Sequence, residues 1–490
     1  MTGPRDVAQG GQEEPSGTLA STSVDEVDEP SDSGDSAGSS MLVTGLGGVG
    51  ELLATLGVGY LTSRYLFADG RGEYTAIVLW VLTAGWMGSF GLRESIVWVL
   101  KKNPDEEKAI VGSVLALLLV LGLVTTGLVE LLVPLGFREQ TPEAVRLAKV
   151  AGLSTFVIMG FYALQGMLAA RENFKALAWS QMLHPVAVFC IMRGLYVFGE
   201  FDVASAVATK LAVVATISVV GLAWTIRLTG IGRPSYALAR EMMVFGSKLQ
   251  VYNLGQISNG QLDLVILPAV VEASEIGHYS VAVLTASTII VVFGRISSVV
   301  LPLVARAERA EGLLLLERIL RVVLVASLAS AVVLALIARP FFVFVFGDEF
   351  SDSVQPLILL LPGIIAWSVN MNASAGLQAM DLPGRTSWSQ LGATVVTIIG
   401  LAISLEPFGI LGAAVTSTCA YLTALCISIT FLVRDCGFPA LRVLAFTRLP
   451  SDIKILAQKV KPGGGDDEPT DHSPDAPAAG DPNDPELSPA

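Results

Sequence analysis

Apolar runs of about 18 to 25 residues recur along the 490-residue chain, and they limit its fold more than any other feature. At a rise of about 1.5 Å per residue, one such run crosses the roughly 30 Å of hydrocarbon in a bilayer. The chain is 52% hydrophobic and only 15% charged, which is too apolar for a soluble protein of this size. The runs also lack the roughly ten-residue alternation of an outer-membrane barrel. The sequence therefore predicts an all-α polytopic membrane protein.

Twelve membrane spans are predicted, and the connections between them are short and rich in glycine, proline and charge. The spans are placed at 42–66, 74–100, 109–134, 144–168, 176–198, 203–226, 243–268, 278–301, 319–346, 354–379, 387–405 and 409–433. Both ends of the chain are acidic and poor in apolar residues, which predicts disorder. Between the last span and the acidic end, Ala440–Lys461 is basic and partly amphipathic, which predicts short helices on the inner membrane surface.

An internal repeat emerges when the two halves are aligned at an offset of roughly 203 to 211 residues. Gly72-Glu73-Tyr74-Thr75 then falls on Gly277-His278-Tyr279-Ser280, and Trp179-Ser180-Gln181 falls on Trp388-Ser389-Gln390. Six spans per half is an even number, so the halves share one orientation and are related by a pseudo-two-fold axis along the membrane normal. The predicted organisation is a tail at 1–40, two six-helix lobes at 41–235 and 236–436, and a second tail at 437–490.

Lysine and arginine residues in the predicted loops indicate the orientation. With the N-terminus inside, the cytoplasmic loops hold fourteen of these residues and the opposite loops hold six. Since positive charge concentrates on the cytoplasmic side, both termini are predicted to be cytoplasmic, in a multi-pass protein of the cell membrane.

The predicted seventh span carries more polar side chains than lipid tolerates. Its polar residues recur at steps of three and four, so on a helix they form one stripe: Gln250, Asn253, Gln256, Asn259 and Asp263. An acid at membrane depth costs roughly 2.5 to 3.5 kcal/mol on insertion scales, so Asp263 is expected to face protein or water. Two interpretations stay open. The stripe joins helices together, or it lines a transport cavity.

Arg93 and Arg295 occupy matching places in the second and eighth spans. A guanidinium inside a span is costly unless it reaches water or an acid, and a symmetric pair beside a cleft can bind a phosphate or diphosphate. We therefore predict that both bind substrate, together with the polar stripe. The alternative is that each side chain snorkels to the inner surface or pairs within its own lobe, for which Glu94 is an adjacent acid.

Glu51, in the first span, and Asp263 are the candidate coupling acids. Each could take up a proton or a cation that drives conformational change, and the alternative for Glu51 is a packing contact. No metal or cofactor is expected, because the three histidines show no ligand spacing and the four cysteines form no CxxC pair. Three cysteines lie in apolar runs, which predicts buried thiols. The net charge of −13 argues against nucleic acid as a partner.

Six short motifs resemble those of a known transporter family. They are Asp69–Tyr74, Gly91–Ile96, Gln261–Asp263, Gly277–Ala282, Pro302 and Phe346–Phe350. The chain resembles the polysaccharide and lipid-linked oligosaccharide exporters of the multidrug/oligosaccharidyl-lipid/polysaccharide superfamily over about residues 42–434. Those exporters usually carry a basic residue where this chain has Leu264, next to Asp263.

The resemblance implies a V-shaped, two-lobed transporter with the fold of MATE proteins, and not an enzyme. Such a transporter works by alternating access and flips a polyprenyl-linked saccharide to the outer leaflet. The expected partners are then the lipid-linked oligosaccharide, the lipid bilayer and glycosyltransferases of the same pathway. Few lysines relative to arginines, together with the acidic tails, also resemble proteins of salt-loving archaea, which implies a dolichyl-type lipid.

Two other functions compete with a flippase. A drug or cation antiporter of the same fold would use Asp263 or Glu51 to couple ion movement. A membrane-embedded glycan polymerase or glycosyltransferase would need a sizeable extramembrane loop or a metal-binding DxD near the membrane, and the longest predicted gap between spans is about 18 residues.

The predicted topology places Ser274 outside and Ser235 in the cytoplasm. Cysteines introduced at these two positions are therefore expected to react with an impermeant thiol reagent from opposite sides of the membrane. Labelling of both from the same side would contradict the shared orientation of the two lobes.

Overall fold

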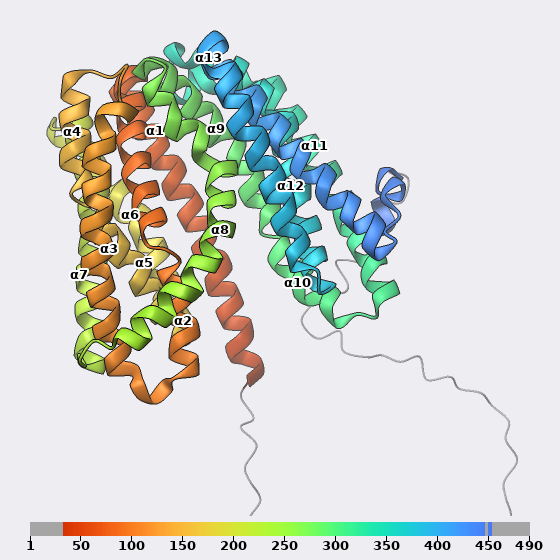
Figure 1. The fold of residues 1–490 in the computed structure, drawn as a ribbon. Helices are drawn as coiled ribbons and strands as arrows, with labels where there is room; N and C mark the ends of the chain where they lie inside the picture. Colours follow the sequence, from red (N-terminus) through yellow and green to blue (C-terminus); the bar gives the residue numbers. More distant parts are fainter. Residues whose placement is uncertain (1–32, 446–448, 453–490) are drawn as a thin grey trace, which may run out of the picture.

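The structure of the protein, a computed structural model, describes residues 33–445 and 449–452 (Figure 1). Within these residues all regular secondary structure is helical. Only the backbone is described for 33–49, 174, 251–254, 256–258, 298–299 and 441. The first helix begins at Ser33, inside the predicted tail 1–40, and most of both predicted tails lies outside the described residues.

The helices of the N-terminal half pack against α1 (Ser33–Gly88) and against one another. The others are α2 (Leu92–Lys102), α3 (Glu107–Gly136), α4 (Pro142–Gly152), α5 (Thr155–Ala170), α6 (Phe174–Phe198) and α7 (Val203–Thr229). The helices that follow are α8 (Tyr236–Ile266), α9 (Ala273–Gly294), α10 (Ser297–Arg306), α11 (Arg309–Val345), α12 (Val354–Ala379) and α13 (Pro383–Cys436). Short 3₁₀ turns at Pro104–Glu106, Leu267–Ala269, Asp348–Ser353 and Ala440–Leu444 complete the fold.

Two of these helices are each broken in the middle. α1 breaks at Phe67 (φ 59°) and α13 breaks at Gly409 (φ 51°), so each runs as two consecutive segments. All twelve predicted ranges fall on helical segments. By length and composition, eight helices of the described chain could cross a membrane, or nine if the bent pair α4 and α5 is one span. The all-α, multi-pass fold is confirmed, and the count of twelve crossings stays a prediction.

Matching backbone irregularities in the two halves support the internal repeat. Glu172 follows α5 and Asp381 follows α12, and both non-glycine residues adopt positive φ angles, of 57° and 59°. These residues lie 209 positions apart, within the offset expected from the sequence. The second helix of each half is also interrupted at matching places, at Ser89–Gly91 and at Arg295–Ile296. Positive φ angles are uncommon for residues other than glycine, and these interruptions recur at matching positions. Their recurrence indicates a duplicated backbone.

The two halves meet backbone to backbone at one end, which we call the closed end (residues 68–72 and 273–280). A Cβ atom added to Gly72 would overlap the carbonyl oxygen of Ala273, and one added to Gly277 would overlap that of Ala68. Gly72 and Gly277 are the residues that the repeat aligns, so the pseudo-two-fold axis passes between α1 and α9 here. Figure 1 shows the halves leaning together at this end and diverging toward the other.

α8 crosses from one half to the other. Near its start, Phe245 stacks on Trp98 of α2 with ring centroids 4.6 Å apart, and Gly246 packs directly against the carbonyl of Phe90. Near its end, Asn259 donates to Gln390 of α13. The predicted lobe boundary at 235/236 therefore precedes a helix whose first turns pack on the N-terminal half.

The segment after α13 packs on the C-terminal half. Asp452 forms ion pairs with Arg321 and Arg318 of α11, and Arg321 also pairs with Glu317 and donates to the carbonyl of Arg442. Arg321 is only 1% exposed. The described part of the predicted surface segment Ala440–Lys461 is thus held by a buried ionic cluster, and the remainder lies outside the described residues.

The expectation of buried thiols is wrong for three of the four cysteines. Cys190, Cys419 and Cys426 are exposed on the outside of the helices, and only Cys436 is buried. An apolar run predicts that a helix enters the membrane, but it does not predict which face of that helix contacts other helices.

The contact at the closed end predicts that Gly72 and Gly277 tolerate no side chain. Gly277→Ala is expected to lower the free energy of unfolding by about 1–3 kcal/mol, because the new methyl group overpacks the contact with Ala68. Gly127→Ala is the matched control, since nothing lies within 4 Å of its added Cβ. Thermal unfolding of the purified variants measures both. Equal stability of Gly277→Ala and Gly127→Ala would contradict the backbone contact.

Candidate functional site

Asp263 is buried where α8, α9 and α13 meet. The hydroxyl of Tyr279 donates to Asp263 Oδ2 at 2.5 Å, and the hydroxyl of Ser417 donates to the same oxygen at 3.0 Å. The N–H of Leu264 donates to Oδ1 at 2.8 Å. No arginine or lysine of the described residues forms an ion pair with Asp263. The carboxyl group is therefore held by neutral donors inside the protein and away from lipid, as an acid at membrane depth requires.

Two other residues of the polar stripe also bond to neighbouring helices. Asn259 donates to the side-chain oxygen of Gln390 at 2.6 Å, and Gln250 donates to the carbonyl of Met87 at 3.0 Å. Both are largely buried. The side chains of Asn253 and Gln256 lie outside the described residues. These contacts fit a stripe that joins helices, and the cavity-lining role of the stripe stays a prediction.

Arg295 and Glu51 form an ion pair that links α9 to α1. Arg295 Nη2 lies 3.6 Å from Glu51 Oε2, and the two side chains are 58% and 45% exposed. The structure thus brings together one predicted substrate-binding residue and one predicted coupling residue. Because the pair is half exposed, its net contribution to stability is only about 0.2–1 kcal/mol. Such a pair can be exchanged for another partner at little cost.

Arg93 lies at the matching break in the N-terminal half. It sits in the first turn of α2, just after Gly91, whose φ of 65° allows the chain to turn between α1 and α2. Its guanidinium interacts electrostatically with Tyr162 of α5. Arg93 and Arg295 thus both lie beside the matching interruptions, Arg93 just after one and Arg295 at the start of the other, and their side chains have different neighbours.

Polar contacts across the closed end were missed by sequence reasoning. Arg71 is buried, donates to Ser280 Oγ at 3.2 Å and also bonds to Thr62. Gln140 donates to the carbonyls of Pro268 and Val271, at 3.2 and 2.9 Å. Arg71 lies in the motif Asp69–Tyr74, directly before the repeated Gly72–Thr75, but the sequence alone does not show which residues it contacts.

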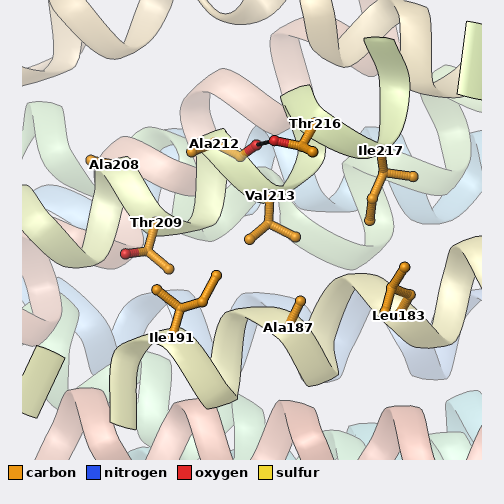
Figure 2. A pocket seen from close by; sticks show the side chains of 9 residues that line it. All are labelled: Leu183, Ala187, Ile191, Ala208, Thr209, Ala212, Val213, Thr216 and Ile217. Carbon is orange, nitrogen blue, oxygen red and sulfur yellow. Dashed lines mark hydrogen bonds between the residues drawn. The ribbon is translucent and has the colours of Figure 1, made fainter. Parts of the chain in front are cut away.

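An apolar groove of about 470 Å³ lies between α6 and α7 (Figure 2). Figure 2 shows short or branched side chains, among them Ala187, Ala212 and Val213, facing one another across it. Thr216 bonds to the carbonyl of Ala212 in its own helix. The groove therefore offers little for a polar ligand to recognise.

A second, smaller cavity is polar and lies between α10, α12 and α13. Its volume is about 280 Å³, and Gln390, the partner of Asn259, is part of its wall. Sequence reasoning missed it, although Asn370, Asn372 and Ser374 are three polar residues within five positions of an apolar span. Among the described residues no three His, Cys, Asp or Glu side chains cluster as metal ligands would.

A family model described as polysaccharide biosynthesis protein matches residues 64–355. The match extends over the closed end, over α8 with Asp263, and over the breaks beside Arg93 and Arg295. The chain belongs to this family. The resemblance inferred from the six motifs, to a family of polysaccharide biosynthesis, is thereby confirmed.

One curated relative is the probable low-salt glycan biosynthesis flippase Agl15 of Haloferax volcanii. It is 23% identical over 209 residues, which are 41% of this chain and 44% of the relative. The match therefore spans less than half of that relative's length.

Solved structures share the fold at low sequence identity. The lipid II flippase MurJ in an inward closed conformation has a TM-score of 0.68 at 15% identity, over 85% of this chain and 91% of that one. A multidrug resistance MATE family transporter in an inward-facing conformation has a TM-score of 0.65 at 14% identity, over 81% and 96%. An outward-facing MATE transporter gives 0.51 at 14% identity, over 83% and 95%. These likenesses establish the MATE-like architecture predicted from the sequence.

Proposed function

We propose that the chain is a flippase that moves a lipid-linked saccharide from the cytoplasmic to the outer leaflet by alternating access. Its family, the name of its curated relative and the name of the MurJ structure support this function. The structural observation that carries it is the arrangement of the two halves. They touch at one end through glycine backbones and diverge at the other, as a transporter with access from one side requires.

The closed end is the outer end in this proposal. Residues 68–72, 140 and 269–277 belong to predicted outer connections, and the positive loops lie at the opposite end. The two similar structures with the higher TM-scores are both named as inward conformations. The described state then admits substrate from the cytoplasmic leaflet of the cell membrane. Both termini lie in the cytoplasm, where glycosyltransferases of the same pathway would deliver the saccharide.

Arg295 and Arg93 receive the phosphate group of the lipid carrier in this mechanism. Glu51 pairs with Arg295 in the described state, and the phosphodiester or diphosphate of a lipid-linked saccharide competes for this guanidinium, because its non-bridging oxygens accept forked hydrogen bonds as a carboxylate does. The released Glu51 no longer ties α1 to α9. Substrate binding would thus weaken a contact between the halves and promote their movement.

The arginine mechanism predicts graded effects. Arg93→Gln and Arg295→Gln are each expected to lower the flipping rate by about tenfold or more, since a lost charged hydrogen bond is worth about 1.5–3 kcal/mol. Arg93→Lys should be milder, because the charge survives without the forked geometry. Glu51→Gln should retain flipping, because it removes the competitor for Arg295 together with a tie between α1 and α9 that substrate binding would release in any case. The assay is transfer of a lipid-linked glycan across proteoliposomes, with membrane insertion as the control. Normal flipping by the double Gln variant would show that neither arginine binds the phosphate.

An ion-coupled antiporter of the same fold is the second candidate. The observation that favours it is the buried carboxyl group of Asp263, held by Tyr279 and Ser417 with no ion pair among the described residues. A buried acid of this kind is suited to bind and release a proton or a cation. In a flippase, by contrast, the same group only orients α8 and its neighbours.

Asp263→Asn separates the two candidates. The amide keeps the shape and can still accept from Tyr279, but it cannot exchange a proton or a cation. For a flippase without coupling at this site we expect flipping within about tenfold of the parent, with or without a pH or sodium gradient. Near-complete loss in Asp263→Asn, together with gradient dependence of the parent, would assign coupling to Asp263. No glycan flipping by the parent under any gradient would contradict the flippase itself.

A further inference from the structure

The polar cavity in the C-terminal half has the lining of a binding site. Three helices contribute to its wall, and six of its lining residues are polar: Ser297, Asn370, Ser374, Gln378, Thr386 and Gln390. Trp367 adds an aromatic ring. None of the described residues that line it is charged. A few amides and hydroxyls beside an aromatic surface form the usual composition of a site for a small neutral ligand.

Two of the lining residues have polar atoms that nothing in the described chain satisfies. Asn370 is 1% exposed, and its Oδ1 accepts from the hydroxyl of Ser428 at 2.7 Å. Its Nδ2 has no hydrogen-bond partner, and neither has the buried hydroxyl oxygen of Ser374. Asn370 and Ser374 lie one helical turn apart on α12, so both project on the same side of that helix. Buried polar groups are almost always paired in proteins, which indicates that a ligand or water completes these two.

Hydrogen bonds between α12 and α13 hold Asn370 in place. Ser428, its partner, lies 2.9 Å from the hydroxyl of Ser389, which donates to the carbonyl of Ala424 at 2.8 Å. On another wall, Gln390 accepts from Asn259 of α8 at 2.6 Å. These hydrogen bonds hold two walls of the cavity together, and the bond from Asn259 connects it to the polar stripe of α8.

The repeat shows that the fold does not require all of this polarity. At the offset of 209 residues that aligns Glu172 with Asp381, the counterparts of Asn370, Gln378 and Thr386 are Phe161, Ala169 and Leu177. The counterparts of Ser374 and Gln390 are Gln165 and Gln181, so these two positions are polar in both halves. The shared backbone therefore does not explain the amide of Asn370, whereas a ligand does.

We propose that this cavity binds one uncharged sugar ring of the transported lipid-linked saccharide, an inference that rests on the proposed function. Amides and hydroxyls match the alternating donors and acceptors of a sugar, and Trp367 offers a surface for its apolar face. A phosphate or a uronic acid would be buried without a counter-charge, which is unfavourable. The volume of about 280 Å³ is at the lower limit of ligand pockets, about 300–1,000 Å³, and so suits one ring and not a whole oligosaccharide.

Lipid retention by the purified full-length protein in native mass spectrometry tests the proposal. The probes are bare dolichyl phosphate and dolichyl phosphates that carry glucose, N-acetylglucosamine or glucuronic acid. At least one neutral sugar lipid is expected to bind about fivefold or more tightly than the bare lipid, and more tightly than the glucuronic acid lipid. Equal retention of all four lipids, or preference for glucuronic acid, would overturn the proposal.

Two variants test whether this cavity causes the preference for a neutral sugar lipid. Ser374→Ala is expected to lower the affinity for the preferred neutral sugar lipid by about fivefold, as the loss of one hydrogen bond predicts, and to leave the bare lipid unaffected. Asn370→Leu should have at least as large an effect. Ser368→Ala is the matched control, because Ser368 is buried on the same helix but its hydroxyl already donates to the carbonyl of Ile364 at 2.9 Å. Preference unchanged in Ser374→Ala, or lost equally in Ser368→Ala, would overturn the assignment to this cavity.

Flipping in proteoliposomes is measured separately, so the two proposals fail independently. A parent protein that retains neutral sugar lipids in a Ser374-dependent way but flips none of them would support the cavity and contradict the flippase. A parent that flips sugar lipids and bare lipid at equal rates, with no difference in Ser374→Ala, would support a flippase and overturn the sugar site.

Discussion

The contact between the backbones of α1 and α9 at the closed end is the constraint on which the arrangement of the halves depends. Inside a membrane, helices gain little from burying apolar side chains, since lipid tails are equally apolar, and close approach of backbones supplies much of the attraction. Gly72 and Gly277 permit that approach. Because the repeat aligns these two glycines, the contact lies on the symmetry axis and can act as a pivot. Arg71 and Gln140 then add directional bonds that close this end.

The sequence predicted the fold well where a physical rule acts on a single helix. Length and apolarity placed every predicted span on helical backbone, and duplication was visible because motifs such as Gly72–Thr75 recur in order. Asp263 was correctly expected to avoid lipid. This expectation needs only the cost of an acid at membrane depth and no knowledge of the residues that contact it. The breaks at Phe67 in α1 and at Gly409 in α13 fall at the connections predicted after residues 66 and 405. The interruptions at Ser89–Gly91 and Arg295–Ile296 were missed, because they lie inside apolar runs that were predicted as continuous spans.

The details of the site depend on contacts between distant segments, and these were not predictable from one sequence. The stripe on α8 was recognised, but its bonds to Gln390 and Met87 need the positions of α13 and α1. Glu51 and Arg295 were selected for separate roles, and only the structure pairs them. The exposure of Cys190 was not predictable for a similar reason. Hydropathy cannot distinguish a lipid-facing side of a helix from a side that contacts other helices when both are apolar.

The duplication makes the backbone symmetric, but the chemistry of the two halves has diverged. At the offset of 205 residues that aligns Gly72 with Gly277, the counterparts of Asn259 and Asp263 are Ala54 and Val58. At these two positions α8 is polar where α1 is small and apolar, although Glu51 of α1 aligns with Gln256. The unpaired amide of Asn370 also lies in the C-terminal half. In the proposed flippase, contacts to the saccharide would then come mainly from the C-terminal half. The N-terminal half would contribute Arg93, and its bonds from Arg71 and Gln140 at the closed end would have to break when the halves move.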